Sequence, residues 1–134
     1  MIPYALILTQ THIEEMIRHA RTQAPLEACG LLAGRDARVE SVLLVANADQ
    51  SPARFRMDPY EQLRAFDWID TRGLDLVGIF HSHPSGPEAV SPTDIAEAAY
   101  EVVHVILSQH EGKWRARGFW IEAGRSTDVP LAHE

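Results

Sequence analysis

The sequence predicts a mixed α/β (α+β) domain built around one β-sheet. Short β-type runs alternate along the chain with segments whose apolar residues recur at helical spacing. Apolar residues make up 46% of the 134 residues, which is enough for a continuous core. No repeat, low-complexity tract or linker interrupts the chain, so we expect one domain.

A short strand and an amphipathic helix are predicted at the start of the chain. Residues 4–9 form a β-type run. Thr11 is followed three residues later by Glu14, which is the spacing of a capping box, so we expect a helix to begin there. The apolar face of this helix consists of Ile13, Met16, Ile17 and Ala20.

A β-hairpin and a second helix are predicted next. Residues 29–34 and 38–48 are apolar runs separated by a short turn. Asp58 and Pro59 suit the N-cap and first position of a helix, with Glu61 in its first turn. We expect this helix to bury Leu63, Phe66 and Ile69 and to stop at Gly73.

The second half of the chain begins with a run that predicts a central, buried strand. Residues 74–80 are nearly free of charge and lie between turn-forming residues. A loop containing Pro84, Gly86 and Pro87 follows, and a third helix begins after Ser91. We expect further strands at 102–108 and 114–123, joined by a turn at 110–113.

The charge and cysteine content exclude several classes of protein. Twelve Lys and Arg against 19 Asp and Glu give a formal charge of −7, which is the wrong sign for a nucleic-acid binder. A single cysteine cannot form an intramolecular disulfide. The first basic residue is Arg18, so a signal peptide is not expected, and no apolar run approaches the ~18 residues of a membrane span. We expect a cytoplasmic protein that binds neither nucleic acid nor membrane.

One dense cluster of chemically useful side chains occurs at the end of the predicted central strand. His81 and His83 are two residues apart, so their side chains point to the same face of a strand. Asp94 adds a carboxylate at the start of the next helix. Two imidazoles and one carboxylate leave a tetrahedral zinc ion one open position for water, which is typical of a catalytic site.

A general base is also needed, and Glu27 is the candidate. A base must take the proton from the attacking water and later give it to the leaving amine. Glu27 lies beside an apolar strand among small and apolar neighbours, where it has no obvious structural task. A solvated carboxylate between helix and strand is the alternative interpretation.

Together these motifs resemble the signature of the JAMM/MPN metalloprotease family. The signature is an upstream glutamate, then His-Ser/Thr-His-Pro, then Ser-x-x-Asp, and here it reads Glu27, HSHP at 81–84 and SPTD at 91–94. The resemblance implies that residues 1–134 form a single JAMM/MPN domain, in which helices flank a curved mixed β-sheet with cytidine-deaminase-like layering.

The resemblance also implies a role for each motif residue. Zinc would be held by His81, His83 and Asp94, and Glu27 would be the general acid/base. Ser91 would stabilise the oxyanion that forms on the attacked carbonyl. Ser91 is equally suited to be the N-cap of the following helix, in a capping box with Asp94.

The substrate class implied by the resemblance is a protein with a glycine-rich tail. Family members cut peptide or isopeptide bonds after the C-terminal Gly-Gly of ubiquitin or ubiquitin-like proteins, and some compact bacterial members process sulfur-carrier proteins. Residues 25–34 and 54–59 resemble the flanks of these compact members. The large insertions of eukaryotic deubiquitinases are missing, and Val90 replaces a frequent Pro before the serine.

Three other interpretations remain open at this point. Two histidines and one carboxylate also form the facial triad of mononuclear iron(II) enzymes, although these enzymes usually have β-barrel folds. A metal-free MPN scaffold would bind partners without catalysis. A Cys/His hydrolase would need Cys29 as its nucleophile, although a lone cysteine is usually a small buried hydrophobe. No role is expected for the remaining histidines, which are His12, His19, His104, His110 and His133.

Overall fold

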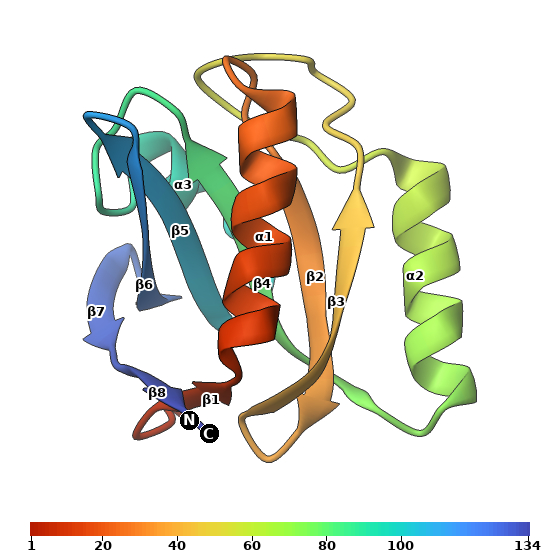
Figure 1. The fold of residues 1–134 in the computed structure, drawn as a ribbon. Helices are drawn as coiled ribbons and strands as arrows, with labels where there is room; N and C mark the ends of the chain where they lie inside the picture. The colour runs from red at the N-terminus through yellow and green to blue at the C-terminus, as the bar shows by residue number, and fades with distance from the viewer.

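Eight strands form one mixed sheet in the computed structural model, which describes residues 1–134. The order across the sheet is β7-β6-β5-β4-β2-β3-β1-β8. The strands are β1 (Leu6–Leu8), β2 (Cys29–Arg35), β3 (Arg38–Val45), β4 (Asp75–His83), β5 (Val103–His110), β6 (Lys113–Glu122), β7 (Arg125–Val129) and β8 (Leu131–His133). The helices are α1 (Gln10–Gln23), α2 (Pro59–Thr71) and α3 (Pro92–Glu97). The expected mixed α+β fold with a curved sheet is therefore confirmed (Figure 1).

Two apolar cores lie on opposite faces of the sheet. Helix α1 crosses one face, in front of β4 and β5 in Figure 1, and packs Ile13, Met16 and Ala20 against that face. Helix α2 lies beside β3 and packs Ile69 against the other core. Because neighbouring side chains of a strand point to opposite faces, Phe80 of β4 joins the α1 core while Ile79 joins the α2 core.

Strand β4 has the central position that its apolar sequence predicts. It pairs antiparallel with β2 and parallel with β5. The strand is longer than the predicted 74–80, because the parallel pairing with β5 continues as far as His83 opposite Ser108. The cluster of motif residues therefore begins inside the sheet instead of in the loop that follows it.

The predicted start of the first helix is wrong by two residues. The N-cap is Thr9, whose side chain accepts a hydrogen bond from the His12 amide at 3.2 Å. In return, the His12 Nδ1 atom accepts a hydrogen bond from the Thr9 amide at 3.1 Å. A histidine thus closes the capping box, and the Thr11–Glu14 pair that suggested a later start lies within the helix.

The second helix begins as predicted, and two of the three residues of its predicted apolar face pack against the core. Asp58 is the N-cap and accepts a hydrogen bond from the Glu61 amide at 3.0 Å. Ile69 is buried and Phe66 partly buried, whereas Leu63 is 61% exposed, so the prediction for Leu63 is wrong. Only one side of α2 meets the sheet, and Leu63 points away from it.

The hairpin predicted from 29–34 and 38–48 is confirmed, with its second strand ending at Val45. The predicted C-terminal strand is β6, and the turn before it is confirmed. Strands β7 and β8 are not predicted, because the sequence of β7 is mostly polar and β8 has only three residues.

Strand β6 is only half covered on its outer side. β7 pairs with β6 from Gly118 to Glu122, so the segment 113–117 is an unpaired edge. Three cations on this edge, Lys113, Arg115 and Arg117, alternate with Trp114 and Ala116.

None of the three helices is long and apolar enough to span a membrane.

Gly30 in β2 provides a test of how tightly the sheet is packed. A methyl group added here would collide with the Phe80 ring and the Leu43 carbonyl oxygen. We expect Gly30→Ala to lower the free energy of unfolding by about 2 kcal/mol or more, because overpacking forces neighbouring atoms to move. The control is Gly124→Ala, where nothing lies within 4 Å and only the backbone angle, φ +73°, costs about 1 kcal/mol. If urea denaturation showed the same loss of unfolding free energy in Gly30→Ala and Gly124→Ala, this tight packing around Gly30 would be contradicted.

Candidate metal centre and active site

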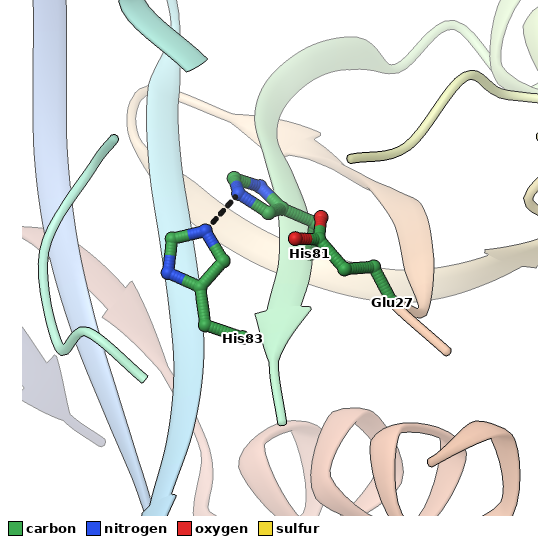
Figure 2. Close-up of side chains that lie close together, drawn as sticks. All are labelled: Glu27, His81 and His83. Atoms are coloured by element: carbon green, nitrogen blue, oxygen red, sulfur yellow. Dashed lines mark hydrogen bonds between the residues drawn. The ribbon is translucent and has the colours of Figure 1, made fainter. Parts of the chain in front are cut away.

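The two histidines of the HSHP motif lie side by side at the end of β4. His81 is paired in register with Cys29 of β2 and Ile106 of β5, and the side chains of His81 and His83 are 0% and 4% exposed. Their Nε2 atoms are 3.1 Å apart, and a dashed line joins the two rings in Figure 2. The alternation of side chains along the strand therefore places both imidazoles on the face covered by α2.

Asp94 reaches the same point from the first turn of α3. Its Oδ1 atom lies 3.2 Å from Nε2 of His81, and its Oδ2 atom lies 3.1 Å from Nε2 of His83. Ser91 is the N-cap of α3: its amide donates to Asp94 Oδ2 at 2.8 Å, and its Oγ accepts from the Asp94 amide at 3.0 Å. The capping box thus orients the carboxylate toward the histidines.

The spacing of these donor atoms fits a small metal ion. Zinc bound tetrahedrally at 2.0–2.1 Å would separate neighbouring ligand atoms by roughly 3.3 Å. The two Nε2 atoms are 3.1 Å apart, close to this separation, and each lies 3.1 to 3.2 Å from a different oxygen of Asp94. The donor set, two imidazole nitrogens and a carboxylate oxygen, also suits zinc.

His83 is oriented by a hydrogen bond on the far side of its ring. Its Nδ1 atom lies 2.9 Å from the backbone carbonyl oxygen of Pro87. A carbonyl oxygen can only accept, so Nδ1 carries a proton and donates it. Neutral His83 therefore has its lone pair on Nε2, the atom that faces His81 and Asp94, which is the arrangement usual for metal ligands.

Glu27 lies against the imidazole pair in the segment before β2. Its side chain is 3% exposed, and its Oε1 atom is buried without a hydrogen-bond partner. One oxygen of Glu27 and one nitrogen of each imidazole all lie within 4.8 Å of one another, so Glu27, His81 and His83 form a group that could hold a metal ion. Figure 2 shows the carboxylate directed toward the rings.

The protonation states of the cluster follow from burial and mutual contact. Burial raises the pKa of Glu27 to about 7, although the positive charge of His83 opposes this shift. Burial also acts on Asp94, but hydrogen bonds from His81 and His83 outweigh it and hold the pKa of Asp94 well below its usual range. Burial lowers the pKa of His81. Asp94 is therefore the permanent anion of the site, and Glu27 can exchange a proton near neutral pH.

Ser82 and Phe55 help to position the site, and the sequence analysis assigned no role to either. Ser82 points to the opposite face from the histidines, and its Oγ accepts a hydrogen bond from the Ala28 amide at 2.8 Å. Phe55, in the loop between β3 and α2, stacks on His81 with ring centroids 4.4 Å apart. Strand alternation was the available signal for Ser82, whereas no local pattern connects Phe55 with His81.

A cavity of about 220 Å³ opens beside two of the candidate metal ligands. His81 and Asp94 line it together with Phe55 and Tyr100. An ion pair between Arg54 and Glu97 joins the β3–α2 loop to α3 at this cavity. The cavity therefore gives a ligand of limited size direct access to His81 and Asp94.

The other candidate residues do not form a second site. Cys29 is fully buried and donates to the Val45 carbonyl at 3.4 Å, and burial raises the pKa of its thiol to about 12. A hydrolase with Cys29 as nucleophile is therefore excluded, since it would need a thiolate. His104 is buried beside the cavity, and burial lowers its pKa to about 4, so this imidazole is neutral.

Comparison with known proteins connects this geometry to a family. Residues 9–120 match the family described as prokaryotic homologs of the JAB domain. A probable TtuB-protein conjugate cleaving protease from Thermus thermophilus is 42% identical over 96 residues, which cover 71% of this chain and 64% of that protein. A desampylase from Pyrococcus furiosus is 30% identical over 131 residues, covering 96% of this chain and 91% of that protein. A CysO-cysteine peptidase from Mycobacterium tuberculosis is 31% identical over 132 residues, covering 96% and 90%.

Solved structures share the fold of this chain. A protein from Desulfitobacterium hafniense superposes with a TM-score of 0.86 at 36% identity, covering 96% of this chain and 92% of that one. A JAB1/MPN domain protein from Archaeoglobus fulgidus, at 15% identity, has the same fold, with a TM-score of 0.61 over 96% of this chain and 98% of that one. The resemblance drawn from the motifs is confirmed, and the chain belongs to the prokaryotic JAB domain family.

Proposed function

We propose that this protein is a cytoplasmic, zinc-dependent peptidase or isopeptidase that cleaves after the C-terminal Gly-Gly of a ubiquitin-like or sulfur-carrier protein. The observation that carries the proposal is the convergence of His81, His83 and Asp94 within 3.2 Å of one another, with the Glu27 carboxylate buried beside them. The three curated relatives, named for cleaving conjugates or a cysteine adduct, support this substrate class.

In this proposal His81, His83 and Asp94 hold the zinc ion. When bound, zinc would polarise the scissile carbonyl and lower the pKa of water. The hydrogen bond from His83 to Pro87 and the capping box around Asp94 support these assignments, because each of them fixes a ligand before any ion arrives.

Glu27 is the proposed general acid and base. It takes a proton from the attacking water and later gives it to the leaving amine. A pKa of about 7 suits both steps, because the carboxylate and the carboxylic acid are then both populated near neutral pH. Its unpartnered Oε1 is free to accept that proton.

Ser91 is the proposed donor to the oxyanion. Its Oγ accepts the Asp94 amide in the cap, and a hydroxyl that accepts one hydrogen bond still has its own proton to donate. The capping and catalytic roles of Ser91 are therefore compatible.

A glycine tail is the proposed ligand next to the metal. Phe55 covers one side of His81, and the segment containing Pro84, Gly86 and Pro87 follows His83 directly. Proline restricts the backbone of this segment, so we expect it to yield little to a branched side chain beside the scissile carbonyl.

The ligand assignment predicts the metal content of two variants. We expect about one zinc per chain in the wild type and little or none in His83→Ala or Asp94→Ala, since a three-ligand site loses its geometry with any one ligand. His110→Ala, at an exposed site, is the control. Zinc near one per chain in both ligand variants, measured by elemental analysis, would contradict the assignment.

The base assignment predicts a variant that is inactive but intact. Glu27→Gln should bind zinc and fold like the wild type while kcat falls at least ~100-fold, because a positioned base typically contributes ~10²–10⁴ in rate. The matched control is Glu14→Gln, because Glu14 lies on the exposed side of α1. A kcat for Glu27→Gln within a few-fold of wild type would show that another group moves the proton.

Substrate cleavage tests the proposed function itself. A ubiquitin-like protein ending in Gly-Gly, extended by one amino acid or by a lysine-linked adduct, should be cut after the second glycine. The same protein ending in Gly-Val should resist, because a branched side chain would clash near the metal. Equal cutting of both substrates by mass spectrometry, or cutting of short unrelated peptides alone, would indicate a general metallopeptidase instead.

A further inference from the structure

The side chain of Asn47 makes four hydrogen bonds at the base of the β3–α2 loop. Its Nδ2 donates to the backbone oxygens of Glu27 and Arg54, both at 3.0 Å. Its Oδ1 accepts from the amides of Asp49 at 3.0 Å and Arg56 at 3.1 Å. An amide side chain has two donor hydrogens and two acceptor lone pairs, so the hydrogen-bonding capacity of Asn47 is fully used.

Asn47 thereby holds together the two ends of the loop formed by residues 46–58, which lies over the candidate metal centre. Two backbone hydrogen bonds also join these ends: the Ala48 amide donates to the Arg56 carbonyl at 2.7 Å, and the Asp58 amide donates to the Ala46 carbonyl at 2.9 Å. Phe55, near the second end, stacks on His81. A residue that is bonded to both ends therefore controls how this loop packs against the histidines.

The backbone of Glu27 is held by the same loop. Its amide donates to the Ser51 carbonyl at 2.8 Å, and its carbonyl accepts from Asn47. Glu27 precedes β2, so sheet pairing does not fix it, and its Oε1 atom has no partner. The position of the carboxylate consequently depends on these two backbone bonds and on Ala28 next to it, which is bonded to Ser82.

We propose that Asn47 is a positioning residue that couples the loop over His81 to the carboxylate of Glu27. The coupling element is the Nδ2 atom of Asn47, which donates both to the backbone carbonyl of Glu27 and to that of Arg54, the residue before Phe55. The inference rests on the proposed function, in which Glu27 moves the proton. It assigns to Asn47 no contact with substrate or metal.

Replacing Asn47 by Asp distinguishes the two hydrogen bonds that the side chain donates from the two that it accepts. Asn47→Asp keeps the acceptor atoms for Asp49 and Arg56 but removes the donors to Glu27 and Arg54. Asn47→Ala, the second variant, removes all four hydrogen bonds of the side chain. The matched control is Ser51→Ala, which loses a hydrogen bond within the same loop, from the Ala53 amide to Ser51 Oγ at 3.0 Å, and keeps both backbone bonds of Glu27.

The first readout needs neither metal nor substrate. Hydrogen exchange of the Glu27 amide, followed by NMR in the zinc-free protein, reports how firmly this segment is held. We expect exchange in Asn47→Asp to be about five- to tenfold faster than in the wild type, as for the loss of one hydrogen bond. In Ser51→Ala we expect a change of less than about twofold.

The second readout is turnover of the Gly-Gly substrate by the zinc-loaded protein. We expect kcat of Asn47→Asp to fall about tenfold or more at unchanged zinc content, with KM within about threefold, because small displacements of a catalytic group are costly. Unchanged exchange at Glu27, a loss in KM alone, or an equal loss in Ser51→Ala would overturn the proposal. So would unfolding of both Asn47 variants, since Asn47 would then be a purely structural residue.

The two proposals fail in different ways. A wild type that does not cleave Gly-Gly substrates contradicts the proposed function, whereas the exchange measurement still decides whether Asn47 holds Glu27.

Discussion

The antiparallel pairing of β2 with β4 is the constraint on which the geometry of the candidate site depends. It sets Cys29 opposite His81, and therefore places Glu27, two residues before Cys29, beside the histidine pair. Ser82 strengthens this junction through two bonds to Ala28, one from its amide at 2.9 Å and one to its Oγ at 2.8 Å. A one-residue slip in this register would send the imidazoles to the opposite face of the sheet from Glu27.

The third component of the site comes from an element that is weak alone. Helix α3 has six residues, too few to be stable in isolation. Its N-terminus is held by the Ser91–Asp94 capping box, and Asp94 in turn contacts both imidazoles. Helix and site therefore stabilise each other, and a cation bound between the ligands would strengthen both by compensating the buried charge of Asp94.

Local sequence patterns predicted the parts of the fold and site that depend on local interactions. The His-x-His strand end and the Ser91 cap follow from side-chain alternation and helix-end chemistry, and both are present. The start of α1 was misplaced because His12 closes the capping box where an acidic residue usually does. The role of Asn47 in holding Glu27 could not be predicted, because it joins residues 20 apart through a loop of no regular pattern.

The free edge of β6 has a consequence for how copies of this protein meet. Unpaired strand edges are templates for association between chains. Two copies aligned antiparallel about Arg115 would place Lys113 of each opposite Arg117 of the other, so like charges would face each other at both ends of the junction. Cations along an unpaired edge strand thus disfavour the pairing of two copies through β6, even though Arg115 and Arg117 also contact Glu88 and Asp128 of their own chain.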